Sequence, residues 1–149
     1  MHCHYNSNYK YNQINEIMRE IRYRGIGIAE RKWVFGSLWF DTRNKATLIW
    51  SEELKYWVRV DPATVGQYTG LKDEHGKEIY EGDVIRSPLS EDKTRPHRIF
   101  YHTGNAAFMG ALVDRKELCY LRLDQDWIYK FGKEVIGNIH DNPELLKNE

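Results

Sequence analysis

Short segments in which apolar and polar positions alternate recur along most of this chain, and turn-forming residues separate them. The segments cover residues 33–40, 46–50, 56–60, 84–85, 98–101, 106–113, 118–123, 127–131 and 134–139. Aromatic and β-branched residues are frequent in them, as is typical of strands. The pattern predicts a mainly β fold with minor α content, built as a small SH3-like, barrel-like domain or as a domain of paired sheets.

Glycine and acidic residues mark the expected turns. Residues 41–44 (DTRN) separate two strands, and residues 73–76 (DEHG) predict a tight turn in which Gly76 takes a positive φ angle. A second turn is expected at residues 81–83 (EGD), and Gly70 and Gly82 are expected in similar turn conformations. Residues 87–96 contain two prolines and no periodicity, which predicts a loop.

Around these turns, six apolar residues are expected to pack into the core: Tyr68, Leu71, Ile79, Tyr80, Val84 and Ile85.

The two ends of the chain differ from this strand-rich part. Residues 142–144 (NPE) predict the start of a short C-terminal helix, because Asn suits the N-cap and Pro the first helical position. Residues 1–17 are rich in His, Asn, Tyr and Ser and contain few aliphatic side chains to offset the entropy of ordering. We therefore expect a flexible N-terminal extension over residues 1–17 and one β domain over residues 18–149.

Four blocks of sequence, spread along the chain, together resemble a known family. The main block is residues 68–73 (YTGLKD) followed by 76–85 (GKEIYEGDVI), and the others are 18–24 (MREIRYR), 32–38 (KWVFGSL) and 134–146 (EVIGNIHDNPELL). Together they resemble the YopX family of phage and prophage proteins. The resemblance implies a small protein of temperate phages and their bacterial hosts, and it supplies no catalytic residues.

The charge of the chain limits the partners to be expected, and its cysteine content limits the cellular compartment. The 149 residues carry 22 Lys and Arg against 22 Asp and Glu, so the formal net charge of zero gives no general attraction to nucleic acid or to an anionic membrane. It favours self-association instead. The two cysteines lie far apart, and no apolar run has the length of a membrane span. These features predict a protein of the reducing bacterial cytoplasm without a membrane partner.

Few residues have the pattern of a catalytic or metal site. His2, Cys3 and His4 are ligand types, but no second cluster completes a four-coordinate site. Cys119 lies in an apolar run typical of a core residue. We interpret the acidic residues Glu78, Glu81 and Asp83 as parts of a turn, with Asp83 accepting backbone N–H bonds and both glutamates solvated. No catalytic residue, metal site or cofactor is predicted, and the protein is not expected to be an enzyme.

Aromatic content directs the functional interpretation. Five tryptophans and ten tyrosines exceed the needs of a small core, and aromatic residues are enriched at protein interfaces. The leading hypothesis is a protein-interaction module that forms homo-oligomers or binds a host or phage protein. The alternative is a nucleic-acid-binding accessory protein, in which Lys93, Arg95 and Arg98 contact phosphates beside nearby aromatic residues.

Overall fold

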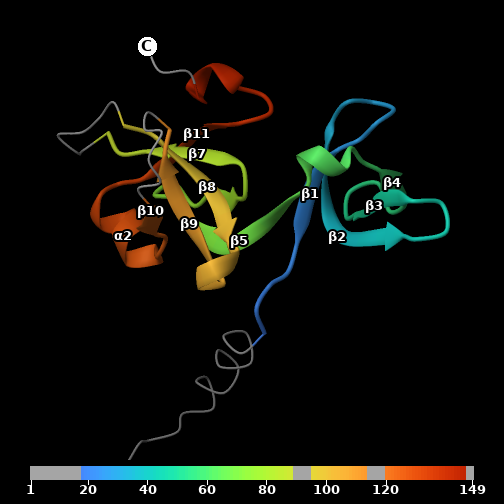
Figure 1. Ribbon diagram of the computed structural model, residues 1–149, viewed down its shortest axis with the longest axis horizontal. Helices are drawn as coiled ribbons and strands as arrows, with labels where there is room; N and C mark the ends of the chain where they lie inside the picture. Colours follow the sequence, from blue (N-terminus) through green and yellow to red (C-terminus); the bar gives the residue numbers. More distant parts are fainter. Residues whose placement is uncertain (1–17, 89–94, 114–119, 147–149) are drawn as a thin grey trace, which may run out of the picture.

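The chain folds into two antiparallel sheets. The computed structural model describes residues 18–88, 95–113 and 120–146 (Figure 1). Its sheets have the strand orders β4-β3-β2-β1-β5-β6 and β10-β9-β8-β7-β11. The expected mainly β fold is thus confirmed in the form of two sheets, and these do not close into the barrel that was the other expectation.

The strands are β1 (Tyr23–Ile26), β2 (Trp33–Asp41), β3 (Ala46–Ser51), β4 (Trp57–Arg59), β5 (Gly66–Lys72), β6 (Glu78–Tyr80), β7 (Asp83–Arg86), β8 (His97–His102), β9 (Ala107–Leu112), β10 (Tyr120–Arg122) and β11 (Glu134–Asn138). The helices among the described residues are the 3-10 turns η1 (Pro62–Thr64), η2 (Thr103–Asn105) and η3 (Pro143–Leu146) and the α-helix α2 (Gln125–Lys130).

Strands β1–β4 curl into a lobe of their own, the curled-sheet lobe. Past the end of β4, Val60 forms an isolated antiparallel bridge with Gly27, just after β1. The amide of Ile28 donates to the carbonyl of Arg59 at 3.0 Å, and that of Asp61 to the carbonyl of Ile26 at 2.9 Å. The curl encloses a small core of Val34, Ile49 and Val60.

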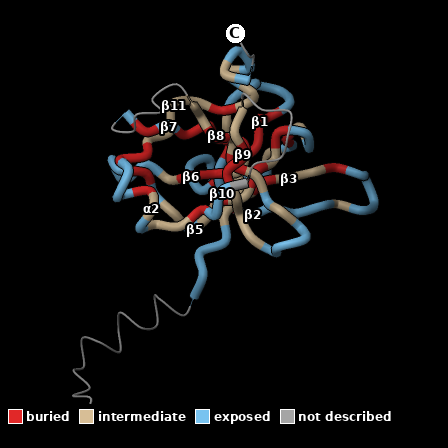
Figure 2. The backbone as a smooth tube through the Cα atoms, turned by 60° about the vertical axis from the view of Figure 1, so that its left-hand side comes forward, coloured by how far each residue is buried: buried red, intermediate tan, exposed pale blue. Residues whose placement is uncertain are grey.

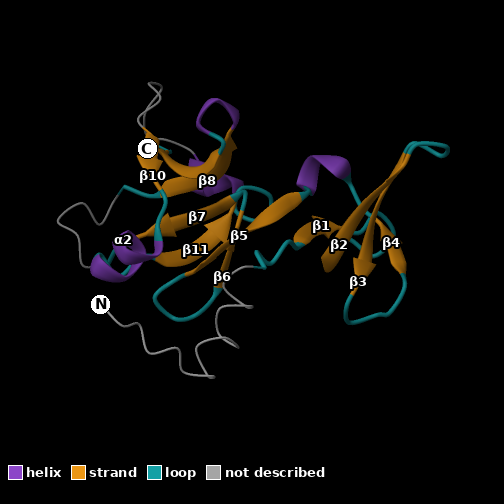
Figure 3. Cartoon of the chain, turned by 90° about the horizontal axis from the view of Figure 1, so that it is seen from below, coloured by secondary structure: helices purple, strands orange, loops and turns teal. Residues whose placement is uncertain are grey.

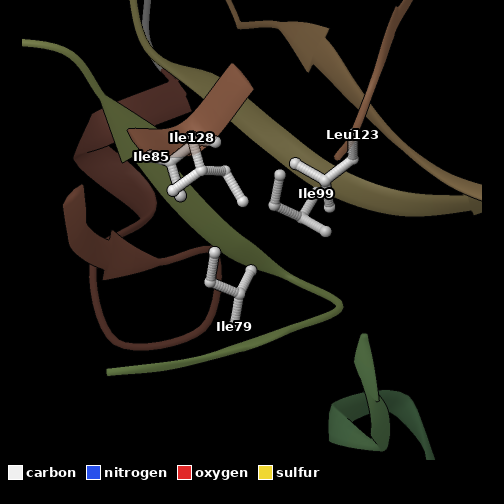
Figure 4. Close-up of a cluster of buried hydrophobic side chains, with 5 residues drawn as sticks. All are labelled: Ile79, Ile85, Ile99, Leu123 and Ile128. Atoms are coloured by element: carbon white, nitrogen blue, oxygen red, sulfur yellow. The ribbon is translucent and has the colours of Figure 1, made fainter. Parts of the chain in front are cut away.

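The second lobe, the helix-bearing lobe, comprises β6–β11 and α2, and β5 runs between the two lobes (Figures 1 and 3). Its core contains Ile79, Ile85, Ile99, Leu123 and Ile128, contributed by β6, β7, β8 and the α2 region (Figure 4). Five of the six expected core residues are buried, and Leu71 packs against this core while half-buried. The tip of the β2–β3 hairpin, unlike these core residues, is exposed (Figure 2).

One expected strand is a helix. Residues 127–131 were predicted as a strand from their aromatic content, which is wrong, because residues 125–130 form α2. Asp124 caps the helix by accepting the amide of Trp127 at 2.8 Å, and Lys130 lies in its last turn. The short apolar run does not show the 3.6-residue period of a helix, since only Ile128 of this helix is fully buried.

The acidic turns form as the sequence indicates. The carboxylate of Asp73, which is 2% exposed, accepts the amides of His75 and Lys77, both at 2.8 Å, and that of Val135 on β11 at 3.1 Å. Gly76 has a φ angle of +82°, as predicted, and Gly82 also has a positive angle. Gly70 has a positive angle too, but it lies inside β5, at an irregularity in the pairing with β6, and not in a turn. The C-terminal helix is present as η3.

Some predictions fall outside the described residues. They concern the extension over residues 1–17, the His2–Cys3–His4 cluster, Cys119 and the middle of the 87–96 loop. Among the residues that the structure does describe, no helix is long and apolar enough to span a bilayer.

Substitutions at two glycines allow the cost of backbone strain to be compared with the cost of steric overlap. A Cβ at Gly76 would have open space, so Gly76→Ala meets only the cost of its φ angle, about 1 kcal/mol. A Cβ at Gly36 would lie 1.8 Å from the carbonyl oxygen of Trp50. We expect Gly36→Ala to lower the free energy of unfolding much more than Gly76→Ala, as measured by urea denaturation. Equal losses would contradict the close approach of β2 and β3 at Gly36.

Candidate functional site

The curled-sheet lobe has a cavity of about 560 Å³ at one end, the end groove, lined by residues 27–30, 32–35, 51–54 and 56–59. Buried Val34 and half-buried Val58 are part of its lining. Phe35, Leu54 and Tyr56 also line it, yet they remain 42%, 44% and 52% exposed. The end groove is therefore an apolar depression with large side chains accessible at its surface.

Two turns hold the walls of the end groove. The first spans residues 27–32, where the amide of Gly27 donates to the carbonyl of Lys32 at 2.8 Å. The second follows β3, where the Ser51 hydroxyl accepts the amide of Leu54 at 2.9 Å and the Ser51 amide donates to Tyr56 at 3.0 Å. Because these turns are tied to the ends of β1 and β3, the groove side chains stand on fixed backbone.

A tryptophan cluster extends the apolar surface away from the end groove. Trp57 on β4 lies opposite Trp50 on β3, with ring centroids 5.6 Å apart, and 5.5 Å from the ring of Trp39 on β2. Trp57 itself lines the groove. The exposed large apolar residues of this lobe are Ile28, Phe35, Leu38, Trp39, Phe40, Leu54, Tyr56 and Trp57.

A second feature lies where the two lobes meet, at the Arg24 junction, which consists of Arg24, Trp33, Tyr80, Asp83 and Asp141. Arg24 on β1 is 7% exposed, and its Nη2 donates to Asp83 Oδ1 at 2.7 Å. Its guanidinium carbon lies 4.6 Å from the ring centroid of Trp33 and 5.0 Å from that of Tyr80. A single cation therefore contacts β2, β6 and β7 together.

The C-terminal segment closes this junction. The indole Nε1 of Trp33 donates to Asp141 Oδ2 at 2.8 Å, and Asn138 Nδ2 donates to the same oxygen at 3.0 Å. The hydrogen bonds from Asn138 and Trp33 lower the pKa of Asp141, so this carboxylate remains ionised. A cavity of about 350 Å³ lies here, with Arg24 and Asp141 among its lining residues.

Burial shifts the pKa values of two groups on the other side of the junction. It raises the pKa of Asp83, and the charge of Arg24 and the amide of Tyr80, which donates to Oδ2 at 2.8 Å, act in the opposite direction. Burial also raises the pKa of Tyr80, whose hydroxyl donates to Glu78 Oε2 at 3.0 Å. The carboxylate of Asp83 and the hydroxyl of Tyr80 thus have partners within the protein, whereas the Nε atom of Arg24 is buried with no hydrogen-bond partner among the described residues.

The blocks that identified the family in the sequence converge at this point. Arg24, Trp33, the Tyr80–Asp83 turn and Asp141 come from four different blocks. The family model described as "YopX protein" matches residues 4–147. The chain belongs to the YopX family. The match begins inside the segment expected to be an extension.

A solved structure also resembles this chain. The crystal structure of protein EF1440 from Enterococcus faecalis has a TM-score of 0.57 and 26% sequence identity, over 87% of this chain and 100% of that chain. No curated protein sequence matches the chain significantly. The comparisons therefore establish the family and a shared fold.

Two of the residues considered for nucleic-acid binding, Arg95 and Arg98, lie in the helix-bearing lobe and do not line the end groove. Arg98 is on β8, with its guanidinium carbon 5.5 Å from the ring centroid of Phe100. Arg95 is two residues before β8, and Lys93 is outside the described residues. Arg98 pairs with Val84, the residue after Asp83 of the Arg24 junction, but it does not line the cavity at that junction.

The remaining polar candidates have structural partners. Asp83 accepts a backbone amide, as expected, but Glu78 and Glu81 are half-buried rather than solvated. Glu78 pairs with Arg22, and Glu81 Oε1 accepts the amide of Gln67 at 3.0 Å. Within the described part of the chain, no group of three or more His, Cys, Asp or Glu residues is placed to hold a metal ion.

Sequence reasoning missed the Arg24 junction and the end groove. A signal for the junction existed, because Arg24 is the one charged residue of the short strand β1, between Tyr23 and Gly25. The groove had no such signal, since it depends on the curl that brings the turn at 27–32 close to the turn that follows β3.

We expect Arg24→Met to lower the free energy of unfolding by about 3–5 kcal/mol at neutral pH, because it leaves Asp83 buried without its partner. Loss of the cation raises the pKa of Asp83 further. A folded-state pKa above the unfolded value stabilises the fold at acid pH, and this contribution is lost as the pH rises through the folded pKa. The deficit of Arg24→Met should therefore shrink towards acid pH in urea denaturation.

The matched control is the double variant Arg24→Met/Asp83→Asn, which carries no ionisable group at position 83. It should recover part of the lost stability at neutral pH and show a smaller dependence on pH than Arg24→Met. If Arg24→Met were as stable as the unaltered protein, the junction would not hold the lobes together.

Proposed function

We propose that this YopX protein is a non-enzymatic protein-interaction module that uses the end groove to bind apolar side chains of a protein surface. The observation that carries the proposal is the exposure of Phe35, Leu54 and Tyr56 around a cavity of about 560 Å³. Apolar surfaces of this kind, bordered by polar residues, mark interaction sites on soluble proteins.

The charges around the end groove support a protein partner. Glu30, Glu52 and Glu53 lie in its lining together with Lys32 and Arg59. A mixed border of this kind is typical of the polar rim of a protein interface and provides no single sign of charge to attract a polyanion. Aromatic side chains at its centre provide large contact areas at a low entropy cost.

The carboxylates and histidines support a non-enzymatic role. Asp83 is paired with Arg24, Glu78 with Arg22, and His75 Nε2 lies 3.2 Å from Glu134 Oε2. These groups are used in contacts that hold the fold. We place the protein in the bacterial cytoplasm during a phage life cycle, where the partner is a second copy of this chain or a host or phage protein.

The first test compares Leu54→Glu with Phe40→Glu. Both residues are exposed, at 44% and 56%, but only Leu54 lines the end groove. Light scattering over a concentration series measures self-association, and affinity capture followed by binding of the purified partner measures a complex with another protein. We expect Leu54→Glu to weaken the complex about thirtyfold or more, the size of an interface hot spot, and Phe40→Glu to leave it unchanged.

Two results would contradict this function. One is a protein that stays monomeric and captures no partner. The other is a complex that Leu54→Glu and Phe40→Glu weaken equally, because the binding surface would then not be the end groove.

A further inference from the structure

The second sheet presents a face that the proposed function does not use. Register places Arg86, Arg98 and Arg122 on this face, because Val84 pairs with Arg98, Phe100 with Met109, and Met109 with Arg122. The opposite face carries Ile85 and Ile99 and is covered by the core. The arginine face therefore lies opposite the core of the helix-bearing lobe; Val84 and Ala111 on this face are buried, and Arg86 and Arg122 are its exposed arginines.

The charge of the arginine face has one sign over four strands. On β7–β10 its charged residues are the three arginines, and none of them forms an ion pair with a described residue. The one carboxylate on the face is that of Glu134 on β11, opposite Arg86, and it lies 3.2 Å from His75. Asp124 follows β10, where its carboxylate caps α2.

An aromatic group stands among these arginines. The guanidinium carbon of Arg98 lies 5.5 Å from the ring centroid of Phe100, and the ring of His102 is 6.1 Å from that of Phe100. A cavity of about 140 Å³ has Arg98 and Phe100 in its lining together with Glu81, whose carboxylate accepts the amide of Gln67. Guanidinium planes and aromatic rings are the groups on which unpaired bases stack.

The geometry points to single-stranded nucleic acid as the occupant of the arginine face: we propose that its phosphates contact Arg86, Arg98 and Arg122 and that a base stacks beside Phe100. Arg86 and Arg122 are three strand spacings apart, about 14 Å, which several successive phosphates can span. Five strands side by side are wider than the major groove of about 12 Å, so the face does not enter a duplex.

The test uses the full chain and a fluorescent oligothymidylate of about 20 nucleotides, with binding measured by anisotropy from about 50 to 200 mM salt. Affinity should fall steeply with salt. Arg86→Gln and Arg122→Gln alter exposed residues, and each should weaken binding and reduce the slope of log affinity against log salt by about 0.7. Phe100→Leu should weaken binding about fivefold or more while leaving that slope unchanged.

Two control variants lie in the other lobe. Arg43→Gln removes an exposed arginine from the turn between β2 and β3, and Leu54→Glu alters the end groove. Both should bind the oligonucleotide as the unaltered protein does, so this proposal and the protein-interaction function can fail separately. Thermal melting checks that each variant is folded. If Phe100→Leu is unfolded, the comparison rests on Arg122→Gln, which alters an exposed residue.

Three outcomes would overturn the proposal. The first is a failure to bind the oligonucleotide at about 50 mM salt, or binding that does not weaken as the salt concentration rises. The second is equal weakening by Arg43→Gln and Arg122→Gln. The third is displacement of the oligonucleotide by polyglutamate as effective as by unlabelled oligothymidylate, because the face would then be a site for acidic proteins. A duplex of the same length should compete less well than the single strand.

Discussion

The buried ion pair between Arg24 and Asp83 is the interaction on which the arrangement of the two lobes depends. Removing two charges from water costs several kcal/mol for each ion, and their attraction repays this cost only when their hydrogen bonds are complete. Here Asp83 also accepts the amide of Tyr80, and the guanidinium of Arg24 lies against two aromatic rings, but the Nε atom of Arg24 is buried with no hydrogen-bond partner among the described residues. The pair is therefore best understood as fixing position, since an arrangement of the lobes that separates the two ions while keeping them buried leaves each charge without a partner.

Strand β5 adds a second link between the lobes. It pairs with β1 at Gln67 and with β6 at Tyr68, while Leu71 near its end packs against the core of the helix-bearing lobe. Val65, just before β5, packs against the core of the curled-sheet lobe. The two small cores are thus connected through one continuous strand as well as through a side-chain contact. The end groove and the arginine face lie on different sides of this connection, one in each lobe.

The strands and turns of this fold could be predicted because their signals are local. Alternating apolar positions indicated most strands, and Asp73 with Gly76 indicated a turn whose conformation only a few residues adopt. The helix α2 was missed because its strongest signal is the cap Asp124, outside the aromatic run that suggested a strand. The Arg24 junction and the end groove depend on register and curl between segments far apart in the chain, which no single segment encodes.

The edges of both sheets carry a consequence for solubility. An aromatic-rich chain with a net charge of zero has little protection against aggregation through open strand edges. In the described structure the edge strands β4, β6 and β10 have three residues each, and β11 contains a register shift between Val135 and Gly137. Short or bulged edges are poor templates for the addition of another strand. The exposed aromatic side chains can therefore remain available for specific contacts without uncontrolled growth of the sheets from chain to chain.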